Sequence, residues 1–136
     1  MNVKHIYSLK YDSARLKSLT QASQSLDPRL GLSSKNGVIG SEEWWKNINE
    51  GKIVVRLIEG RITRVFISGH NDFPEFEMNS DGKISIRECL ATKLDYDRHY
   101  EVGKTIVIRY AEVYRKGLNT PHELVLDIWG EDERER

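Results

Sequence analysis

Residues 52–130 show a period-two alternation of apolar and polar side chains, and this feature restricts the fold more than any other. The alternation is clearest in YEVGKTIVIRYAEVYR and in HELVLDIWG. The apolar side chains that we expect on the inner face are Ile106, Ile108, Tyr110, Leu124, Leu126 and Ile128. Such a pattern is typical of β-strands with one buried face. It predicts a sheet of about six antiparallel strands.

The stretch KIVVRLIEGRITRVFISG places Glu59-Gly60 between two β-rich runs, which predicts a tight hairpin at that point. A sheet of this size must cover its hydrophobic face or close on itself. We therefore expect an α+β fold. Its core would be a small, curved antiparallel β-barrel or half-barrel over residues 52–130, with N-terminal helices packed on one face.

The N-terminal residues 1–51 are mixed and partly helical. NVKHIYSL has a weak alternation that fits a short strand, and SARLKSLTQASQSL carries leucines near one helical face. SEEWWKNINEG predicts a second helix, with Ser41 as N-cap and Gly51 as terminator. Together with the β-rich core and a charged tail at residues 131–136, these segments indicate a single domain spanning residues 1–136.

The segment EFEMNSDGKISIREC, residues 75–89, allows two interpretations. With Gly82 in the sixth position, residues 77–88 resemble an EF-hand calcium loop, although Glu77 stands where an aspartate is usual. An EF-hand also needs a preceding helix, and Pro74 lies inside the segment that would have to form it. We therefore predict a β-hairpin that turns at NSDG and binds no metal, and weak calcium binding stays as the alternative.

The formal net charge is zero, with 21 basic and 21 acidic side chains. Proteins that bind nucleic acid through phosphates usually carry a basic excess, so the balance argues against that class. Charge is unevenly distributed, because residues 70–81 contain four acidic side chains and no Lys or Arg. An acidic segment of this kind is complementary to a basic partner.

Several features indicate the cytoplasm. A lone cysteine, Cys89, excludes an internal disulfide and fits a reducing compartment. The N-terminus lacks the apolar core of a secretory signal. No apolar run approaches the roughly 20 residues that cross a bilayer, so we expect no membrane partner.

Recognisable catalytic motifs are absent from the sequence: there is no GxSxG, Walker loop, dinucleotide fingerprint or HExxH. Cys89 is the one candidate nucleophile, but a single cysteine near the end of an amphipathic strand is more often a small core residue. Asp95, Asp97 and His99 could share one side of an extended segment and hold a metal, although a solvated segment is the simpler interpretation. We expect no catalytic residue, metal or cofactor.

Two groups of side chains are candidates for contact with a partner. The first is the acidic and aromatic segment at residues 70–81. The second is the adjacent tryptophan pair, because a helix cannot bury both rings on one face and tryptophan is enriched at binding hot spots. The predicted partner-binding residues are Asp72, Phe73, Glu75, Glu77, Trp44 and Trp45.

Three functions follow, and the preferred one is a non-catalytic intracellular protein that binds and blocks another protein with a basic surface. Bacterial immunity proteins, which neutralise a cognate toxin by direct binding, have this general profile; the analogy is one of class. The second is a nucleic-acid-binding small barrel of the OB type. Its candidate contacts are Arg56, Arg61, Arg64, Arg109, Phe66 and Tyr110. The third is an enzyme of unrecognised type, centred on Cys89 or a histidine.

Overall fold

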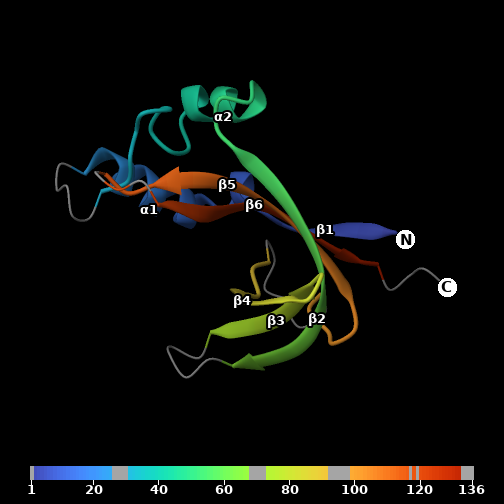
Figure 1. Cartoon of the computed structure of the whole chain (residues 1–136). Coiled ribbons are helices and arrows are strands. Elements are labelled where there is room, and N and C mark those ends of the chain that lie inside the picture. The colour runs from blue at the N-terminus through green and yellow to red at the C-terminus, as the bar shows by residue number, and fades with distance from the viewer. Residues whose placement is uncertain are drawn as a thin grey trace. The chain divides into compact units, whose positions relative to one another are not determined.

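The computed structural model describes residues 2–25, 31–67, 73–91, 99–116, 118 and 120–132. In chain order the elements are β1 (Val3–Ser8), the short 3₁₀ helix η1 (Leu9–Tyr11), α1 (Ser13–Gln24), α2 (Glu42–Asn49), β2 (Val55–Ile67), β3 (Pro74–Ser80), β4 (Lys83–Glu88), β5 (Thr105–Tyr114) and β6 (Pro121–Glu131). The strands form one six-stranded antiparallel sheet in the order β1-β6-β5-β2-β3-β4 (Figure 1).

The chain divides into two compact units. The first combines Met1–Ser8, Leu57–Ile108 and Asp127–Arg136. The second combines Leu9–Arg56 with Arg109–Leu126 and contains α1 and α2. In the part of the chain that the structure describes, no helix is both long enough and apolar enough to cross a membrane.

The α+β class is confirmed, but the sheet is not closed, so the predicted barrel is not confirmed. Closure would require the two end strands, β1 and β4, to pair with each other, whereas β1 pairs with β6 and β4 pairs with β3. The number of strands is as predicted, but the part of the chain that supplies them differs from the prediction. The stretch from residue 52 to residue 130 supplies five of them, and the N-terminal strand β1 is the sixth.

The predicted hairpin at Glu59-Gly60 is wrong, because β2 runs without interruption from Val55 to Ile67. Gly60 is buried inside this strand. A Cβ atom there would lie 2.4 Å from Cε of Met78 and 2.8 Å from the carbonyl oxygen of Asn79. Glycine is therefore required for the close approach of β3, which is the second common reason for a glycine within a strand.

The inner faces of β5 and β6 agree with the predicted alternation except at Tyr110, which is only half-buried, while the next residue, Ala111, is fully buried. Ile106, Ile108, Leu124, Leu126 and Ile128 are each at most 3% exposed, and β5 and β6 are neighbours in the sheet. In the first unit, Phe76 and Met78 of β3 are completely buried. The Phe76 ring packs against the buried Tyr100 ring at 4.9 Å between centroids. These side chains form the apolar side of β3 that the period-two pattern predicts.

Both helices of the second unit begin at side-chain caps. Asp12 accepts a hydrogen bond from the backbone N–H of Arg15, and Ser41 accepts one from Trp44, so the Ser41 cap is confirmed. Gly51 ends α2 with a positive φ of 78°, as predicted. The sequence also predicts a helix end at Asp27-Pro28, because the residue before a proline disfavours the helical conformation. These two residues lie outside the described residues, and α1 ends at Gln24.

The tight approach at Gly60 predicts the effect of adding one methyl group. Gly60→Ala should destabilise the protein by about 1–3 kcal/mol, because β2 and β3 must separate or Met78 must leave its buried position. Denaturant unfolding of the variant measures this cost. Met78→Ala should make room for the added methyl group, so the fall in thermal midpoint of Gly60→Ala/Met78→Ala should be smaller than the sum of the two single falls. If Gly60 instead served a turn between two strands, the two falls would simply add.

The burial pattern predicts opposite outcomes for the same substitution at two strand positions. Ile108→Ala should cost about 2–5 kcal/mol because Ile108 is fully buried. Ile84→Ala should stay within about 0.5 kcal/mol because Ile84 is 52% exposed. Equal costs for the two variants in denaturant unfolding would contradict the assignment of faces.

Candidate partner-binding site

The β3–β4 hairpin turns through two residues, Asp81 and Gly82. Both have positive φ, 51° and 87°, which is the geometry of a type I′ turn. The Asn79 side chain accepts a 2.7 Å hydrogen bond from the backbone N–H of Gly82 and holds the turn. Ser80 pairs with Lys83 directly before and after it. The predicted hairpin at NSDG is thus confirmed, and the side-chain oxygen of Asn79 that a calcium loop would use is occupied by the turn.

This turn fixes the register of the hairpin and so decides which side chains share a face. Phe76 and Met78 lie opposite Arg87 and Ser85 on the inner side. The other side, which we call the hairpin outer face, is made of three cross-strand pairs. They are Glu75 with Glu88, Glu77 with Ile86, and Asn79 with Ile84.

Hydrogen bonding shows that these three pairs are the close ones. Cys89 donates its backbone N–H to the carbonyl of Pro74 at 3.0 Å, which makes this a hydrogen-bonded pair. Bonded and non-bonded pairs alternate along an antiparallel ladder, so the pairs of the outer face are non-bonded. Side chains of non-bonded pairs approach each other most closely. Glu75 and Glu88 are therefore two carboxylates in direct opposition, an arrangement that destabilises a sheet on its own.

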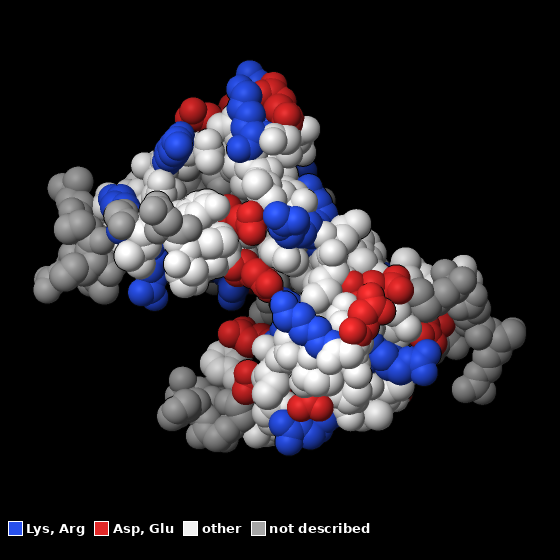
Figure 2. Space-filling view, in the orientation of Figure 1, with Lys and Arg blue, Asp and Glu red and all other residues white. Residues whose placement is uncertain are grey.

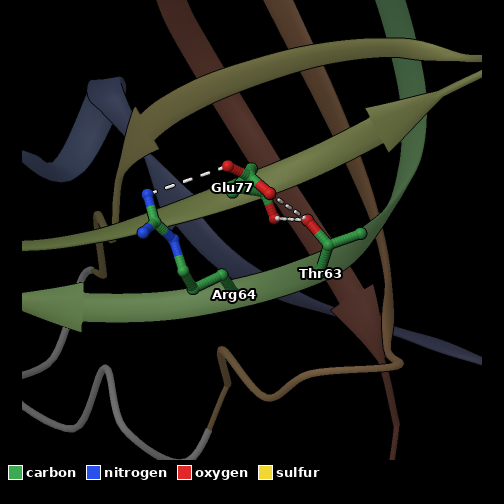
Figure 3. A network of polar contacts seen from close by, with 3 residues as sticks. All are labelled: Thr63, Arg64 and Glu77. Atoms are coloured by element: carbon green, nitrogen blue, oxygen red, sulfur yellow. Dashed lines mark hydrogen bonds and ion pairs between the residues drawn. The ribbon is translucent and has the colours of Figure 1, made fainter.

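The carboxylate of Glu77, in contrast, has polar partners on the neighbouring strand β2 (Figure 3). The register of β2 shifts between Ile62 and Arg64, so two residues of β2 face Glu77. Thr63 donates to the Glu77 carboxylate at 2.9 Å, and Arg64 approaches it at 3.7 Å. The Arg64 guanidinium also lies 4.2 Å above the ring centroid of Phe66. These contacts connect Glu77, in the middle of the outer face, to β2 and give its carboxylate a basic partner within the sheet.

The hairpin outer face also exposes two isoleucines, a feature that the sequence prediction missed. Ile84 is 52% and Ile86 is 51% exposed. They stand on the face opposite to Phe76 and Met78, so β4 presents its apolar side outward. The sequence contains a signal for this arrangement. Once the turn is placed at Asp81-Gly82, pairing the residues outward from it on both strands puts Ile84 opposite Asn79 and Ile86 opposite Glu77.

The predicted contact residues of the acidic segment have different surroundings. Asp72 lies outside the described residues. Phe73 is 56% exposed, next to the start of β3. Glu75 is half-buried, and Glu77 carries the contacts just described. The structure thus brings Glu75 and Glu77 together on the hairpin outer face, where Glu88, Ile84 and Ile86 join them.

The tryptophan pair belongs to the second unit. Trp44 is only 2% exposed and packs in the interior, whereas Trp45 is half-buried. Their rings meet edge to face, with 4.8 Å between centroids. Trp44 offers almost no surface to a partner, so of the two only Trp45 keeps a possible contact role. Trp44 also lines a small hollow, together with Ser33, Asn36, Gly37, Ile39, Ile53 and residues 112–114 of β5.

Cys89 does not have the environment of a nucleophile. Its side chain is 7% exposed. Burial, helped by the negative charge of Glu75, raises the pKa of the thiol to about 12. The thiolate is the reactive form, so at neutral pH Cys89 remains a protonated core residue. Burial likewise raises the pKa of the neighbouring Tyr100, whose hydroxyl donates to the carbonyl of Leu90.

The alternative metal and nucleic-acid sites gain little from the structure. Asp95 and Asp97 lie outside the described residues, and within the described ranges no group of three or more His, Cys, Asp or Glu side chains could hold a metal. Of the candidate arginines, Arg56 faces Glu112 at 3.6 Å and Arg64 faces Glu77. Basic and acidic side chains are interspersed on the face drawn in Figure 2.

Comparison with known proteins identifies the family. No curated protein matches the chain. A family model described as "Immunity protein RhsI2" matches residues 3–120. The match runs from the first residue of β1 to the residue before β6 and so includes the whole hairpin outer face. The chain therefore belongs to the RhsI2 family of immunity proteins.

Proposed function

We propose that this chain neutralises a cognate protein toxin by binding it directly, without a catalytic step of its own. The observation that carries the proposal is the family match over residues 3–120. The buried, protonated Cys89 supports it, because the sole thiol of the chain is unsuited to nucleophilic chemistry. A bacterial cytoplasm is the setting that we propose, in line with the single cysteine.

The proposed contact surface is the hairpin outer face together with Phe73. On β4 this face exposes Ile84 and Ile86, and Ile86 lies opposite Glu77. Glu75 and Glu88 lie together at the end away from the turn. Apolar side chains beside charged and polar ones are usual in protein interfaces. The toxin would present a basic group to the two opposed carboxylates. Asp72, which lies outside the described residues, stays a contact predicted from the sequence alone.

The proposal is tested by co-producing this chain with the toxin domain encoded by the neighbouring gene in a toxin-sensitive bacterial strain. We expect survival with wild type and a stable complex in size-exclusion chromatography. Protection without any detectable complex would contradict direct binding. A complex in which the toxin is covalently altered, seen as a mass change, would contradict a non-catalytic role.

The opposed carboxylates give a prediction in which stability and binding change in opposite directions. Glu75→Lys converts the like-charge pair with Glu88 into an opposite-charge pair, which should stabilise the fold by about 0.2–1 kcal/mol. The same change should weaken toxin binding about tenfold or more at low salt. The loss should shrink as ionic strength rises, because salt screens exposed charges. Thermal unfolding and binding titrations at two salt concentrations measure both effects.

Glu43→Lys is the matched control, because it reverses an exposed acidic side chain of α2 in the second unit and changes the net charge equally. It should cost a few tenths to about 1 kcal/mol of stability, since it removes an acidic group from the first helical turn. Toxin binding should change little. If Glu43→Lys weakens binding as much as Glu75→Lys does, overall charge and not the hairpin outer face controls the association.

A further inference from the structure

Strand β4 has an open edge. It is the last strand of the sheet, so in the described part of the chain β3 is its one strand neighbour. Residues of non-bonded pairs direct their backbone N–H and C=O groups away from the paired strand. Ile84, Ile86 and Glu88 belong to such pairs, so their main-chain groups point out of the sheet. The backbone carbonyl of Glu88 already accepts a 2.9 Å hydrogen bond from the backbone N–H of Leu90, which follows the strand.

This edge lacks the usual protection on one of its faces. Edge strands are normally kept apart from other strands by charged side chains, prolines or bulges. The basic residues of β4, Lys83 and Arg87, fall on the inner-side register positions with Ser85. On the hairpin outer face the edge offers Ile84, then Ile86, then Glu88. A row of outward main-chain groups beside two exposed isoleucines is the template for strand addition.

We propose that the open edge of β4 takes up an extended strand of the cognate toxin as an additional strand of the sheet. This inference rests on the proposed function and specifies how the toxin is held. The main-chain groups of Ile84 and Ile86 would supply hydrogen bonds, and the alternate side chains would supply specificity. The toxin strand should carry apolar residues beside Ile84 and Ile86 and a Lys or Arg beside Glu88, where Glu75 adds a second negative charge.

Charge complementarity favours a toxin strand over a second copy of this chain. In a symmetric antiparallel pairing centred on Ile86, Glu88 of one copy would stand opposite Ile84 of the other. The outer-face positions of β4 contain no Lys or Arg, so a second copy would bring no cation to Glu88 on that face. Its carboxylate, already opposed by Glu75, would lose water without gaining a partner, which is unfavourable.

Two substitutions at one position separate main-chain pairing from side-chain contact. Ile86→Ala removes the apolar side chain and keeps the backbone N–H. Ile86→Pro also removes the N–H, which points away from β3, so the hairpin ladder should survive the change. We expect Ile86→Ala to weaken toxin binding about tenfold and Ile86→Pro to weaken it about tenfold further.

The opposite edge of the sheet provides the matched control, Val3→Pro. Asp132 donates to the carbonyl of Asn2 in β1–β6 pairing, so Val3, opposite Glu131, also directs its N–H away from its partner strand. Val3 is 46% exposed, close to the value for Ile86. Val3→Pro should bind the toxin like wild type. Circular dichroism and thermal midpoints verify that each variant is folded.

A measurement on the wild-type chain tests the inference even if the proline variants do not fold. Amide hydrogen exchange is followed by NMR for the free protein and for its complex with the inactivated toxin domain from the neighbouring gene. The outward N–H groups of Ile84 and Ile86 should exchange rapidly in the free protein. In the complex, hydrogen bonding to the toxin strand should slow them at least about tenfold, whereas Val3 should not change.

The outcomes are distinct. Failure of wild type to bind the toxin overturns the proposed function and this inference together. Tight wild-type binding with unchanged exchange at Ile84 and Ile86, or equal affinities for folded Ile86→Pro and Ile86→Ala, overturns the strand addition alone. A wild-type dimer that Ile86→Pro converts to a monomer, with unaltered toxin affinity, assigns the edge to a second copy and overturns it as well.

Discussion

The two-residue turn at Asp81-Gly82 is the constraint on which the proposed site depends. Its positive φ angles select one hairpin register, and a side-chain period of two then assigns every residue of β3 and β4 to a face. A shift by one residue would exchange the isoleucines for Ser85 and Arg87. The placement of both isoleucines on one face, the opposition of Glu75 and Glu88, and the outward direction of the Ile84 and Ile86 main-chain groups all follow from this register.

The hairpin has two features that are unfavourable in the free protein. Two isoleucines face solvent, and Glu75 opposes Glu88 at a close cross-strand pair. Exposed apolar side chains on a folded protein commonly mark a binding surface. Binding sites are often locally suboptimal for stability, because groups that await a partner are unsatisfied in the free protein. Contact with a toxin at this face, as we propose, would be a reason to retain them.

The site was only partly predictable. The acidic composition of the segment points to Glu75 and Glu77, but composition does not reveal that Arg64 and Thr63 contact Glu77. Ile84 and Ile86 were missed because alternation indicates that one face is apolar without indicating which side of the sheet that face joins. Trp44 and Trp45 were recognised as unlike neighbours, while the choice of the buried ring depended on packing in the second unit.

The sequence by itself determined the local structure: the Ser41 cap of α2, the end of that helix at Gly51, the turn at NSDG, and the buried alternation of β5 and β6. These signals act over a few residues, through backbone conformation and hydrogen bonds close in the chain. Only the tertiary structure decided that Gly60 lies within a strand, that β1 joins the sheet beside β6, and that β4 is the last of the described strands at the other edge. Those outcomes depend on which distant strands meet, and that choice is set by packing and by main-chain pairing between segments far apart in the chain.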